Sequence, residues 1–574
     1  MKYTDDKNSQ IVLSLLKQYG IKKIVISPGT TNVPIARSVQ NDDFFEIYSV
    51  VDERSATYFA TGLSFITKEP VVISCTGATA SRNYLSGLTE AFYRKLPIIA
   101  LTSQHHTPDY NDLVPQVTDR RVSQNDVKKY SALLPYVRND EDYKQSVFQV
   151  NYALHHAIEK GGGPVHINVP VSPEYSFTTE KLPSVQKIDY YDEEKIKALK
   201  LSTELNDKKV AIFMGSHNIF SEECIEQINK FVVKNDIPVF YDHTSSYVGK
   251  NGILSAQISD LLQTKNLPDL IIDLGSICGE YSASQLFKNI TTWRISEDGK
   301  FHNRLGVEIL TKVFECSEIS FFNFLNQKNY KTKKYYSILK KEVKKIKIPT
   351  LPLSNTYISM KLSQNIPDKS ILHLGILNSL RNMNFFELNS SIITSSNVGG
   401  FGIDGALSTI IGQSVISREN LSFVLLGDLA FFYDMNALGI KHISKNLRIL
   451  LVNNGLGVEF RLNSKLENQW GADTDDYIAA KGHNGSAKLW AQSMKFEYME
   501  ANTKEEFDKN ILDFCSKEKT RPIVFEVFTK VIDEQQALRL LRDINRPIKC
   551  NKKTIKKIIK KEIKKIIPKK TGGN

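Results

Sequence analysis

The sequence predicts an α/β fold of three doubly wound parallel-sheet domains in a row, followed by a basic tail. Short apolar strands alternate with helical patterns along most of the chain, which is typical of parallel sheets covered by helices. The length of 574 residues suits about three to five domains of ordinary size. We expect domains at 1–185, 190–345 and 350–540, and the tail at 545–574.

The strands of the first domain are predicted from apolar runs that end in turns or polar residues. Helical patterns lie between them, at 53–64 and 80–93. The predicted strands are 21–27, 44–51, 70–75, 96–103 and 164–171.

The second and third domains are predicted from runs of the same kind. A lysine-rich stretch at 331–347 separates them. The predicted strands are 208–215, 237–242 and 267–275 in the second domain, and 391–397, 421–428, 447–454 and 522–529 in the third. No short internal repeat is visible.

Composition and cysteine spacing narrow the class of protein. The chain is 41% hydrophobic and 24% charged, close to the globular average. The polar start, 1–10, has no apolar segment of a secretory signal, and no apolar run reaches the length of a membrane span. The six cysteines are far apart and form no C-x-x-C pair. We therefore expect a cytoplasmic protein with reduced cysteines.

The net charge of +12 is concentrated in the tail. Eleven lysines and one glutamate between Lys549 and Lys570 give +10, which leaves +2 for the rest of the chain. This distribution argues against a nucleic-acid surface over the whole body. Isoleucines recur on one helical face of the tail, so peripheral contact with the anionic inner face of the membrane and a solvated lysine tail are both open. Nonspecific nucleic-acid contact is a third, weaker interpretation.

A βαβ unit in the third domain has polar residues at both strand ends. Gly427-Asp428 ends one strand, Asn453-Asn454 ends the next, and a helical stretch at about 433–444 lies between them. Asp428 and Asn454 should therefore lie at the carboxyl ends of neighbouring parallel strands, where ligands bind in open α/β sheets. A carboxylate, an amide oxygen and a backbone carbonyl suit Mg²⁺.

This pattern resembles the diphosphate–metal motif of thiamine-diphosphate enzymes. The resemblance implies Asp428, Asn454 and the Leu456 carbonyl as metal ligands, with thiamine diphosphate and Mg²⁺ as cofactors. Leu429 stands where many family members have a second glycine. The plainer interpretation is an ordinary βαβ unit that ends in turn-forming residues.

Glu53 follows the second predicted strand, within Asp52-Glu53-Arg54. Alone, it is interpreted as an acid favoured by the dipole at a helix N-terminus. Thiamine-diphosphate enzymes, however, place at such a position the glutamate that hydrogen-bonds the aminopyrimidine ring and activates the cofactor. The resemblance therefore implies that Glu53 is catalytic.

A glycine-rich segment at 396–405 leads into a predicted helix. Its glycines allow a ligand to approach the backbone closely. By the resemblance, Ile403 is the apolar wedge beneath the cofactor and the Phe401 carbonyl meets its amine. The alternative is a simple turn with Asp404 as the helix cap. The other cofactor contacts expected from the resemblance are Gly29, Thr76, Gly399, Gly427, Leu429 and Gly457.

The resemblance becomes specific over most of residues 10–535. Five fragments together resemble the menaquinone-pathway synthases that make succinyl-enolpyruvyl-hydroxycyclohexene carboxylate. The resemblance implies pyrimidine-binding, central and diphosphate-binding domains, a central domain without flavin, and at least a homodimer, with a homotetramer also open. The fragments are 27–29, 52–54, 402–409, 427–438 and 452–457.

The chain departs from this family where the family binds its substrates. Thr30-Thr31-Asn32 replace a Ser-Arg pair, and Ser103-Gln104-His105-His106 replace Asp-Arg-Pro. Val398 and Met383 stand in place of the two donor-site arginines, and Arg381 falls two residues early. A carboxylate site without its arginine loses its main charge-assisted contact. We therefore expect a paralogue with a smaller donor, such as pyruvate, and an acceptor other than isochorismate.

Two further features follow the fourth strand. Gln116, after Pro115, falls where the family has a catalytic glutamine, so the resemblance implies that it touches the reacting intermediate. His105 and His106 are similar to the paired histidines of simple decarboxylases, but they come earlier in the chain. Histidines in a surface loop are the favoured interpretation.

The leading hypothesis is a 2-oxoacid decarboxylase and carboligase that transfers an acyl-anion equivalent to an unidentified acceptor. A sugar intermediate of surface-glycan synthesis would fit a membrane-associated tail. Three rivals stay open: the menaquinone-pathway reaction itself, a simple 2-oxoacid decarboxylase, and a cofactor-binding scaffold without turnover.

Overall fold

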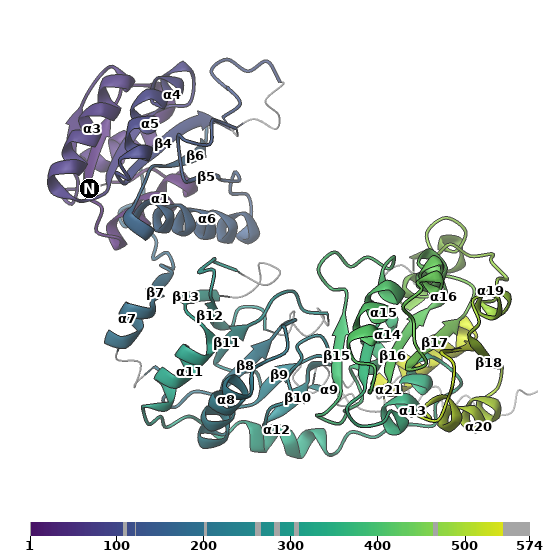
Figure 1. The fold of residues 1–574 in the computed structure, drawn as a ribbon. Coiled ribbons are helices and arrows are strands. Elements are labelled where there is room, and N and C mark those ends of the chain that lie inside the picture. The colour runs from purple at the N-terminus through teal and green to yellow at the C-terminus, as the bar shows by residue number, and fades with distance from the viewer. Residues whose placement is uncertain are drawn as a thin grey trace, which may run out of the picture. The chain divides into compact units, whose positions relative to one another are not determined.

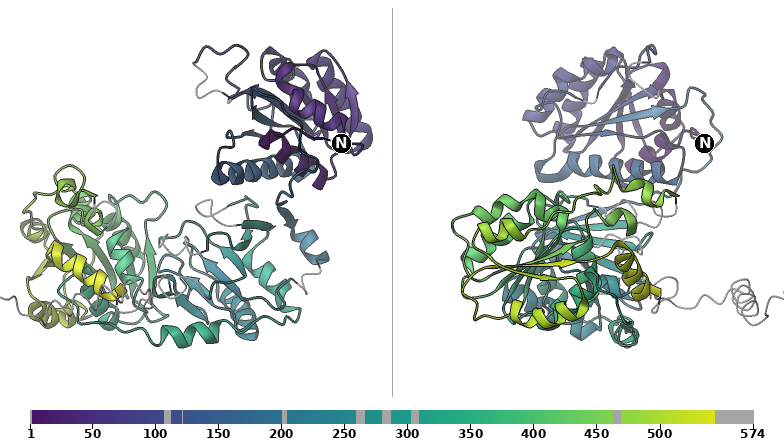
Figure 2. Two further views of the ribbon diagram at one scale, coloured as in Figure 1. Left: turned by 180° about the vertical axis from the view of Figure 1, so that it is seen from behind. Right: turned by 90° about the vertical axis from the view of Figure 1, so that its right-hand side faces the viewer.

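The computed structural model describes residues 2–106, 112–120, 122–199, 204–258, 266–279, 287–302, 309–462 and 469–543. The basic tail predicted at 545–574 lies outside these residues. The chain divides into two compact units, one formed mainly by Met1–Asp192 and the other by most of the remaining chain. Each unit is described by itself (Figures 1 and 2).

Three sheets built from parallel strands form the framework, which confirms the predicted fold class. The first has the order β2-β1-β3-β4-β6-β5, the second β10-β9-β8-β11-β12-β13-β7, and the third β15-β14-β16-β17-β19-β18. The first and third sheets therefore share one strand order, a structural repeat that the sequence did not reveal. The first and third sheets lie within the predicted domains 1–185 and 350–540, whereas the second begins at Asp189, one residue before the predicted second domain. The domain bounds stay predictions.

The first sheet is covered by helices on both faces (Figure 1). Helices α1 and α6 bury one apolar cluster against it, and α3 and α5 bury another. The strands are Lys23–Ile26 (β1), Glu46–Ser49 (β2), Val71–Thr76 (β3), Ile98–His105 (β4), Tyr130–Leu133 (β5) and Val165–Val171 (β6). The helices are Lys7–Gln18 (α1), Val33–Gln40 (α2), Glu53–Thr67 (α3), Thr79–Asn83 (α4), Leu85–Tyr93 (α5) and Asp140–Ile158 (α6), with 3-10 turns at Thr30–Asn32 and Glu159–Gly161.

The second sheet has short strands at both edges, of three and four residues. Its strands are Asp189–Asp192 (β7), Val210–Met214 (β8), Val239–Tyr241 (β9), Gly252–Leu254 (β10), Leu270–Leu274 (β11), Thr291–Ser296 (β12) and Ile309–Glu315 (β13). Its helices are Glu193–Ala198 (α7), Glu222–Asn235 (α8), Ser255–Ile258 (α9), Glu318–Asn326 (α11) and Tyr336–Val343 (α12).

The third sheet also has an apolar cluster on each face. Its strands are Ile371–Leu374 (β14), Ile393–Ser396 (β15), Ser422–Gly427 (β16), Leu447–Asn453 (β17), Glu497–Ala501 (β18) and Ile523–Phe528 (β19). Its helices are Asn355–Asn365 (α13), Asn378–Met383 (α14), Ala406–Ile416 (α15), Asp428–Tyr433 (α16), Glu459–Leu462 (α17), Lys488–Ser493 (α19), Lys504–Phe514 (α20) and Val531–Asp543 (α21), with 3-10 turns at Met435–Gly439 and Gly471–Thr474.

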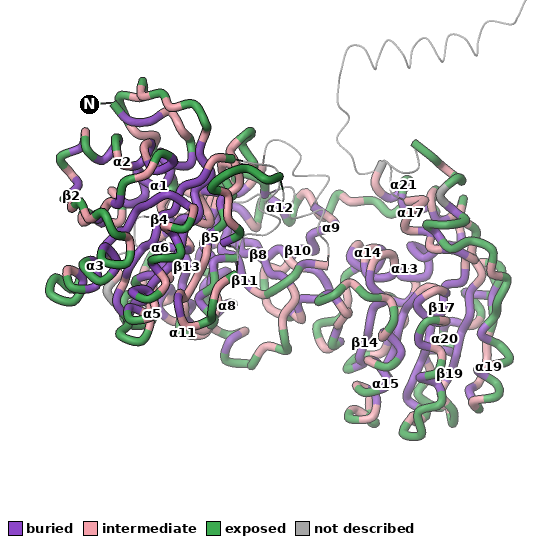
Figure 3. The backbone as a smooth tube through the Cα atoms, turned by 90° about the horizontal axis from the view of Figure 1, so that it is seen from above, coloured by how far each residue is buried: buried purple, intermediate pink, exposed green. Residues whose placement is uncertain are grey.

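Burial explains why the strands appear as continuous apolar runs in the sequence. Every residue of β3 and of β17 is buried, as expected for parallel strands covered on both faces. The buried strands stand out against exposed loops in Figure 3. Within the described residues, no helix is both long and apolar enough to cross a bilayer.

Two helix predictions need correction. The helix expected at 433–444 is wrong, because the chain is helical at Asp428–Tyr433 and makes a 3-10 turn at Met435–Gly439. The helix starts at Asp428 itself, where the helix dipole favours a carboxylate in the first turn. The helix expected at 80–93 is two helices, because Tyr84, which is fully buried, ends α4 and begins α5.

Candidate active site

Glu53 is the first residue of α3, directly after β2. Asp52 caps this helix, because its Oδ1 accepts hydrogen bonds from the backbone N–H groups of Arg54 and Ser55 at 2.8 and 3.2 Å. The half-buried Glu53 carboxylate accepts one hydrogen bond through Oε2, from Asn83 Nδ2 at 3.0 Å. Its other oxygen accepts none from the described residues. Asn83 was missed by sequence reasoning, since it lies thirty residues from Glu53.

Gly29 and Thr76 meet at the carboxyl ends of β1 and β3, where the strand order of the first sheet reverses. A Cβ atom on Gly29 would lie 2.0 Å from Thr76 Oγ1, so only glycine fits there. Thr76 Oγ1 is buried and has no hydrogen-bond partner among the described residues. A buried hydroxyl without a partner at a topological switch point suits a ligand group.

The residues that replace the family's Ser-Arg pair are built into the strand ends. Thr31 is buried, and its hydroxyl donates to the Ser103 carbonyl at 2.5 Å. Asn32 is buried and accepts from Ser74 Oγ at 2.6 Å. These side chains hold the first loop against β3 and β4.

At the end of β4, the residues that replace the family's Asp-Arg-Pro have different neighbours. Gln104 is buried and accepts a hydrogen bond from Arg120 at 2.5 Å. His105 and His106 stack on Tyr175 and Tyr136, respectively. Arg120 is a second residue that the sequence did not single out.

Gln116 lies in the connection between β4 and β5, where its side chain is exposed. Its φ of 65° puts it in the left-handed region, which is uncommon for a residue other than glycine. Such backbone conformations cluster at functional sites. The catalytic role of Gln116 stays a prediction.

In the second unit, Asp428 lies at the end of β16, and Asn454 directly follows β17. Asp428 is 2% exposed. Its Oδ1 accepts from the backbone N–H of Leu429 at 2.8 Å, and its Oδ2 from those of Asn454 and Gly455 at 3.0 and 2.7 Å. The carboxylate therefore joins two neighbouring strand ends, whose proximity the sequence predicted. Burial raises the pKa of the Asp428 carboxyl, although the backbone N–H groups act against this.

The donor set fits a divalent cation. Asn454 is half-buried and its Oδ1 lies 3.4 Å from the backbone N of Leu456, so the carboxylate, the amide and the Leu456 carbonyl belong to one compact turn. A bound cation would stabilise the buried Asp428 carboxylate. The described residues contain no cluster of three His, Cys, Asp or Glu side chains that could hold a metal. Mg²⁺ bound by one carboxylate, one amide and one carbonyl does not need such a cluster, since phosphate oxygens complete its coordination.

The glycines of this motif leave room beside the strand ends. No described atom would lie within 4 Å of a Cβ on Gly427, and the same holds for Gly399. A Cβ on Gly457 would touch Leu429, at 3.4 Å from its Cδ1. Leu429 therefore fills space next to Gly457 without blocking the turn.

His483 is a third residue that sequence reasoning missed. Its Nε2 lies 3.2 Å from Asp428 Oδ2, and its ring meets Phe432 edge-on at 5.3 Å. A group that hydrogen-bonds a metal ligand fixes the ligand's orientation. His483 is 55 residues from Asp428, and no spacing rule in one sequence connects them.

The glycine-rich segment combines an uncommon backbone conformation with a half-buried apolar side chain. Phe401 has a φ of 54°, a left-handed conformation, and Ile403 is half-buried against the clusters on both faces of the sheet. The alternative that Asp404 caps the helix is wrong, because the cap is Gly405 and no side chain bonds there. The Asp434 carboxylate instead accepts hydrogen bonds from the Ser408 backbone N–H and hydroxyl, both at 2.7 Å.

The two positions where the family has donor-site arginines carry apolar residues in this chain. Val398 is 7% exposed and Met383 is fully buried, and both pack in the apolar cluster. The nearby Arg381 forms a two-pronged ion pair with Glu459, at 2.5 Å from Nη1 to Oε2 and 3.0 Å from Nη2 to Oε1. Its charge is thus neutralised by a carboxylate of the same unit.

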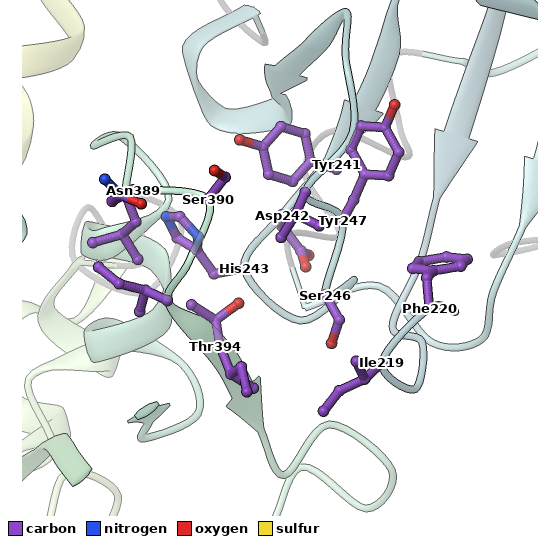
Figure 4. A pocket seen from close by; sticks show the side chains of 14 residues that line it. Ile219, Phe220, Tyr241, Asp242, His243, Ser246, Tyr247, Asn389, Ser390 and Thr394 are labelled. Carbon is purple, nitrogen blue, oxygen red and sulfur yellow. The ribbon is translucent and has the colours of Figure 1, made fainter. Parts of the chain in front are cut away.

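A cavity of about 150 Å³ lies elsewhere in this unit (Figure 4). Residues that follow β9, such as Asp242 and His243, line one part of it. The other part is lined by residues that precede β15, such as Asn389, and by Thr394 of β15 itself. Asp242 accepts from the Thr244 backbone, and His243 Nε2 lies 3.0 Å from the Phe386 carbonyl oxygen. None of the predicted site residues lines it.

Comparisons with known proteins agree with this geometry. Residues 6–131 match the family described as thiamine pyrophosphate enzyme, N-terminal TPP binding domain. Three relatives share the description 2-succinyl-5-enolpyruvyl-6-hydroxy-3-cyclohexene-1-carboxylate synthase. The one from Bacteroides fragilis is 31% identical, covering 95% of this chain and all of its own length. The Phocaeicola vulgatus protein is 30% identical over 95% and 99%, and the Listeria innocua protein 27% identical over 77% and 81%.

These matches confirm the resemblance and the cofactor class, thiamine diphosphate with a divalent metal such as Mg²⁺. Near-complete coverage at this identity shows that the relationship extends through all three sheets. The chain therefore belongs to the family of thiamine-diphosphate-dependent, C–C-bond-forming enzymes that contains the 2-succinyl-5-enolpyruvyl-6-hydroxy-3-cyclohexene-1-carboxylate synthases.

Proposed function

We propose that this enzyme decarboxylates a small 2-oxoacid, such as pyruvate, and transfers the acyl-anion equivalent to an acceptor other than isochorismate. The observation that carries the proposal concerns the positions in the second unit where the family has its two donor-site arginines. Val398 and Met383 are buried apolar residues, and Arg381 is held by Glu459. A second carboxylate on the donor would find no charge-assisted partner there.

Thiamine diphosphate, when bound, supplies the electron sink for loss of CO₂. The Asp428 carboxylate, the Asn454 amide and the Leu456 carbonyl would hold the metal that binds its diphosphate. Phe401 and Ile403 would seat it from the glycine-rich loop, and the Gly399, Gly427, Leu429 and Gly457 positions would shape the same cradle. In the first unit, Gly29 and Thr76 are the proposed contacts to a cofactor.

Glu53 would exchange a proton with the aminopyrimidine ring. Asn83 holds one carboxylate oxygen, and the other accepts no hydrogen bond from the described residues. This arrangement fixes the carboxylate and leaves one oxygen for the ring, as a positioned proton-transfer group requires. Gln116 would then contact the reacting intermediate.

The test is CO₂ release from a panel of 2-oxoacids, with thiamine diphosphate and Mg²⁺, in the presence and absence of acceptors. Release from pyruvate but not from 2-oxoglutarate is expected. Release from 2-oxoglutarate alone would overturn the donor assignment. Aldehyde formation from pyruvate without any acceptor would favour a simple decarboxylase.

The activity named for the relatives is the second candidate. Identity of 31% over nearly the whole chain favours it, whereas the replaced arginines count against it. Turnover that requires both 2-oxoglutarate and isochorismate would establish this candidate. The only support for a sugar acceptor is the basic tail at 545–574, which lies outside the described residues. The proposal therefore does not include a sugar acceptor. The homodimer or homotetramer stays a prediction, which analytical ultracentrifugation of the full chain tests.

A further inference from the structure

Three cationic side chains of the first unit line one small pocket. They are Arg82 at the end of α4, and Arg120 and Lys128 from the connection between β4 and β5. Ser81 and Ser123 add hydroxyl groups, and the buried His166 on β6 lines the same pocket. We call Arg82, Arg120 and Lys128 the cationic cluster.

Arg120 is only 3% exposed, and hydrogen bonds hold its guanidinium in one geometry. Its Nη1 donates to Thr102 Oγ1 at 2.6 Å and its Nη2 to Gln104 Oε1 at 2.5 Å. The guanidinium lies against Gly77, where a Cβ atom would be 2.3 Å from Nη1. Arg120 thus sits at the carboxyl ends of β3 and β4, the sheet edge at which open α/β domains bind ligands.

The cluster concentrates positive charge. Arg82 donates to the backbone carbonyl of Asp119 at 2.6 Å. This carbonyl is neutral, so the contact does not compensate the positive charge of Arg82. No carboxylate among the described residues forms a salt bridge with Arg82 or Lys128. Burial and the charge of Arg82 lower the pKa of Lys128, and burial together with the three cations lowers that of His166. Cations brought together in a partly buried pocket are stabilised by a bound anion.

The cluster lies beside the predicted cofactor contacts of the same unit. Gly77, which Arg120 covers, directly follows Thr76. The charges of Glu53 and Arg120 act in opposite directions on the pKa of Cys75, so both lie near the end of β3. Gln104, which Arg120 contacts, belongs to the segment Ser103-Gln104-His105-His106 that replaces the family's Asp-Arg-Pro. Arg120 therefore supplies a guanidinium beside a segment that has lost one.

We propose that Arg82, Arg120 and Lys128 form a subsite that binds an anionic group of the acceptor, a carboxylate or a phosphate. This assignment rests on the proposed function, since it presumes an acceptor. Arg120 provides the rigid, buried contact, because its two donors are fixed by Thr102 and Gln104. Arg82, which is exposed, and Lys128, which is half-buried, complete the rim.

Calorimetric titration of the full chain with inorganic phosphate and, separately, with malonate tests the subsite. Saturable binding of one of them is expected, and the tighter probe identifies phosphate or carboxylate. Arg120→Gln should weaken that binding at least tenfold. Arg94→Gln serves as the control, because Arg94 is exposed at the end of neighbouring α5 and pairs with Glu90 at 3.6 Å. Failure of both probes to bind, or equal binding by Arg120→Gln, would overturn the proposal.

Should Arg120→Gln fail to fold, the double variant Arg82→Gln/Lys128→Gln carries the same test, because neither side chain is fully buried. The same loss of affinity is expected, and unchanged affinity would refute the subsite. The tighter probe should also leave the KM for pyruvate unchanged in the unmutated enzyme; a rise in KM would place the anion on the donor side and overturn the acceptor assignment. CO₂ release tests the proposed function separately, since the calorimetry decides the subsite even if no 2-oxoacid is decarboxylated.

Discussion

Asn83 and Glu53 are joined by a hydrogen bond of 3.0 Å from the Asn83 amide to Glu53 Oε2. This contact connects the end of α4 with the start of α3 and orients the carboxylate that is expected to activate the cofactor. Glu53→Gln should abolish CO₂ release while leaving cofactor binding largely intact, because the amide keeps the shape of the side chain but cannot take up the proton. Unchanged activity would remove Glu53 from the mechanism.

Asn83→Ala should slow CO₂ release roughly tenfold or more, since a hydrogen bond to a charged group contributes about 1.5–3 kcal/mol. Cofactor affinity, followed by fluorescence titration, should change much less. Asn41→Ala is a matched control, because the exposed Asn41 amide donates to the Lys2 carbonyl, away from Glu53. Equal rates for the two variants would mean that Asn83 does not position Glu53.

Asp428 and His483 define the prediction for the metal site. Asp428→Ala should weaken Mg²⁺-dependent cofactor binding severely, because it removes the only carboxylate of the proposed ligand set. His483→Ala should lower Mg²⁺ affinity by about tenfold or more, as expected for a group that orients a metal ligand. Mg²⁺ titration at fixed thiamine diphosphate measures both effects, with the exposed His442 replaced by alanine as the control. Undiminished affinity in Asp428→Ala would place the metal elsewhere.

Much of this site could be predicted because its signals are local. Gly427-Asp428 and Asn453-Asn454 end two apolar strands, so their neighbourhood follows from parallel pairing, and the register of β16 with β17 bears this out. Glu53 was found in the same way, from its place after a strand. Such residues need only the position of a strand end and the rule that ligands bind there.

The remaining residues could not be predicted because they act across long stretches of chain. Asn83 and Arg120 in the first unit, and His483 in the second, make side-chain contacts whose partners are set by tertiary packing. The shared strand order of the first and third sheets was hidden for a related reason: β5 and β14 are four-residue strands that carry no distinctive pattern. The helix at Asp428 was misplaced because its first residue was taken as the end of the predicted strand 421–428.

The pair Arg381–Glu459 predicts how donor choice can be shifted. Glu459→Gln should release the Arg381 guanidinium from its bidentate partner and make it available to a second donor carboxylate. The ratio of kcat/KM for 2-oxoglutarate to that for pyruvate should rise by about tenfold, the effect of one charge-assisted hydrogen bond. Glu419→Gln, at an exposed residue of the same unit, should leave the ratio unchanged. An unaltered ratio in Glu459→Gln would show that Arg381 does not face the donor.

Glu534 predicts a pH dependence of stability in the second unit. Its carboxylate is 2% exposed, and it accepts hydrogen bonds from the Asn355 backbone N–H at 3.0 Å and from Thr529 Oγ1 at 2.7 Å. Burial, with a contribution from Asp533 and Asp428, raises its pKa from 4.5 to about 7. Between these values the folded chain binds more protons at this group than the unfolded chain does, so the group destabilises the fold increasingly as pH rises from about 4.5 to 7.

Glu534→Gln should therefore stabilise the protein more at pH 8 than at pH 5, because the glutamine keeps an acceptor for Asn355 and Thr529 but never ionises. The full effect has an upper limit of about 3 kcal/mol, from a pKa difference of about two and a half units. Thermal unfolding at pH 5, 6, 7 and 8 measures it as a widening difference in Tm between the variant and the unmutated chain. Glu518→Gln, at an exposed position, should give a difference that stays constant. A constant difference for Glu534→Gln would mean that Glu534 keeps an ordinary pKa in the folded protein.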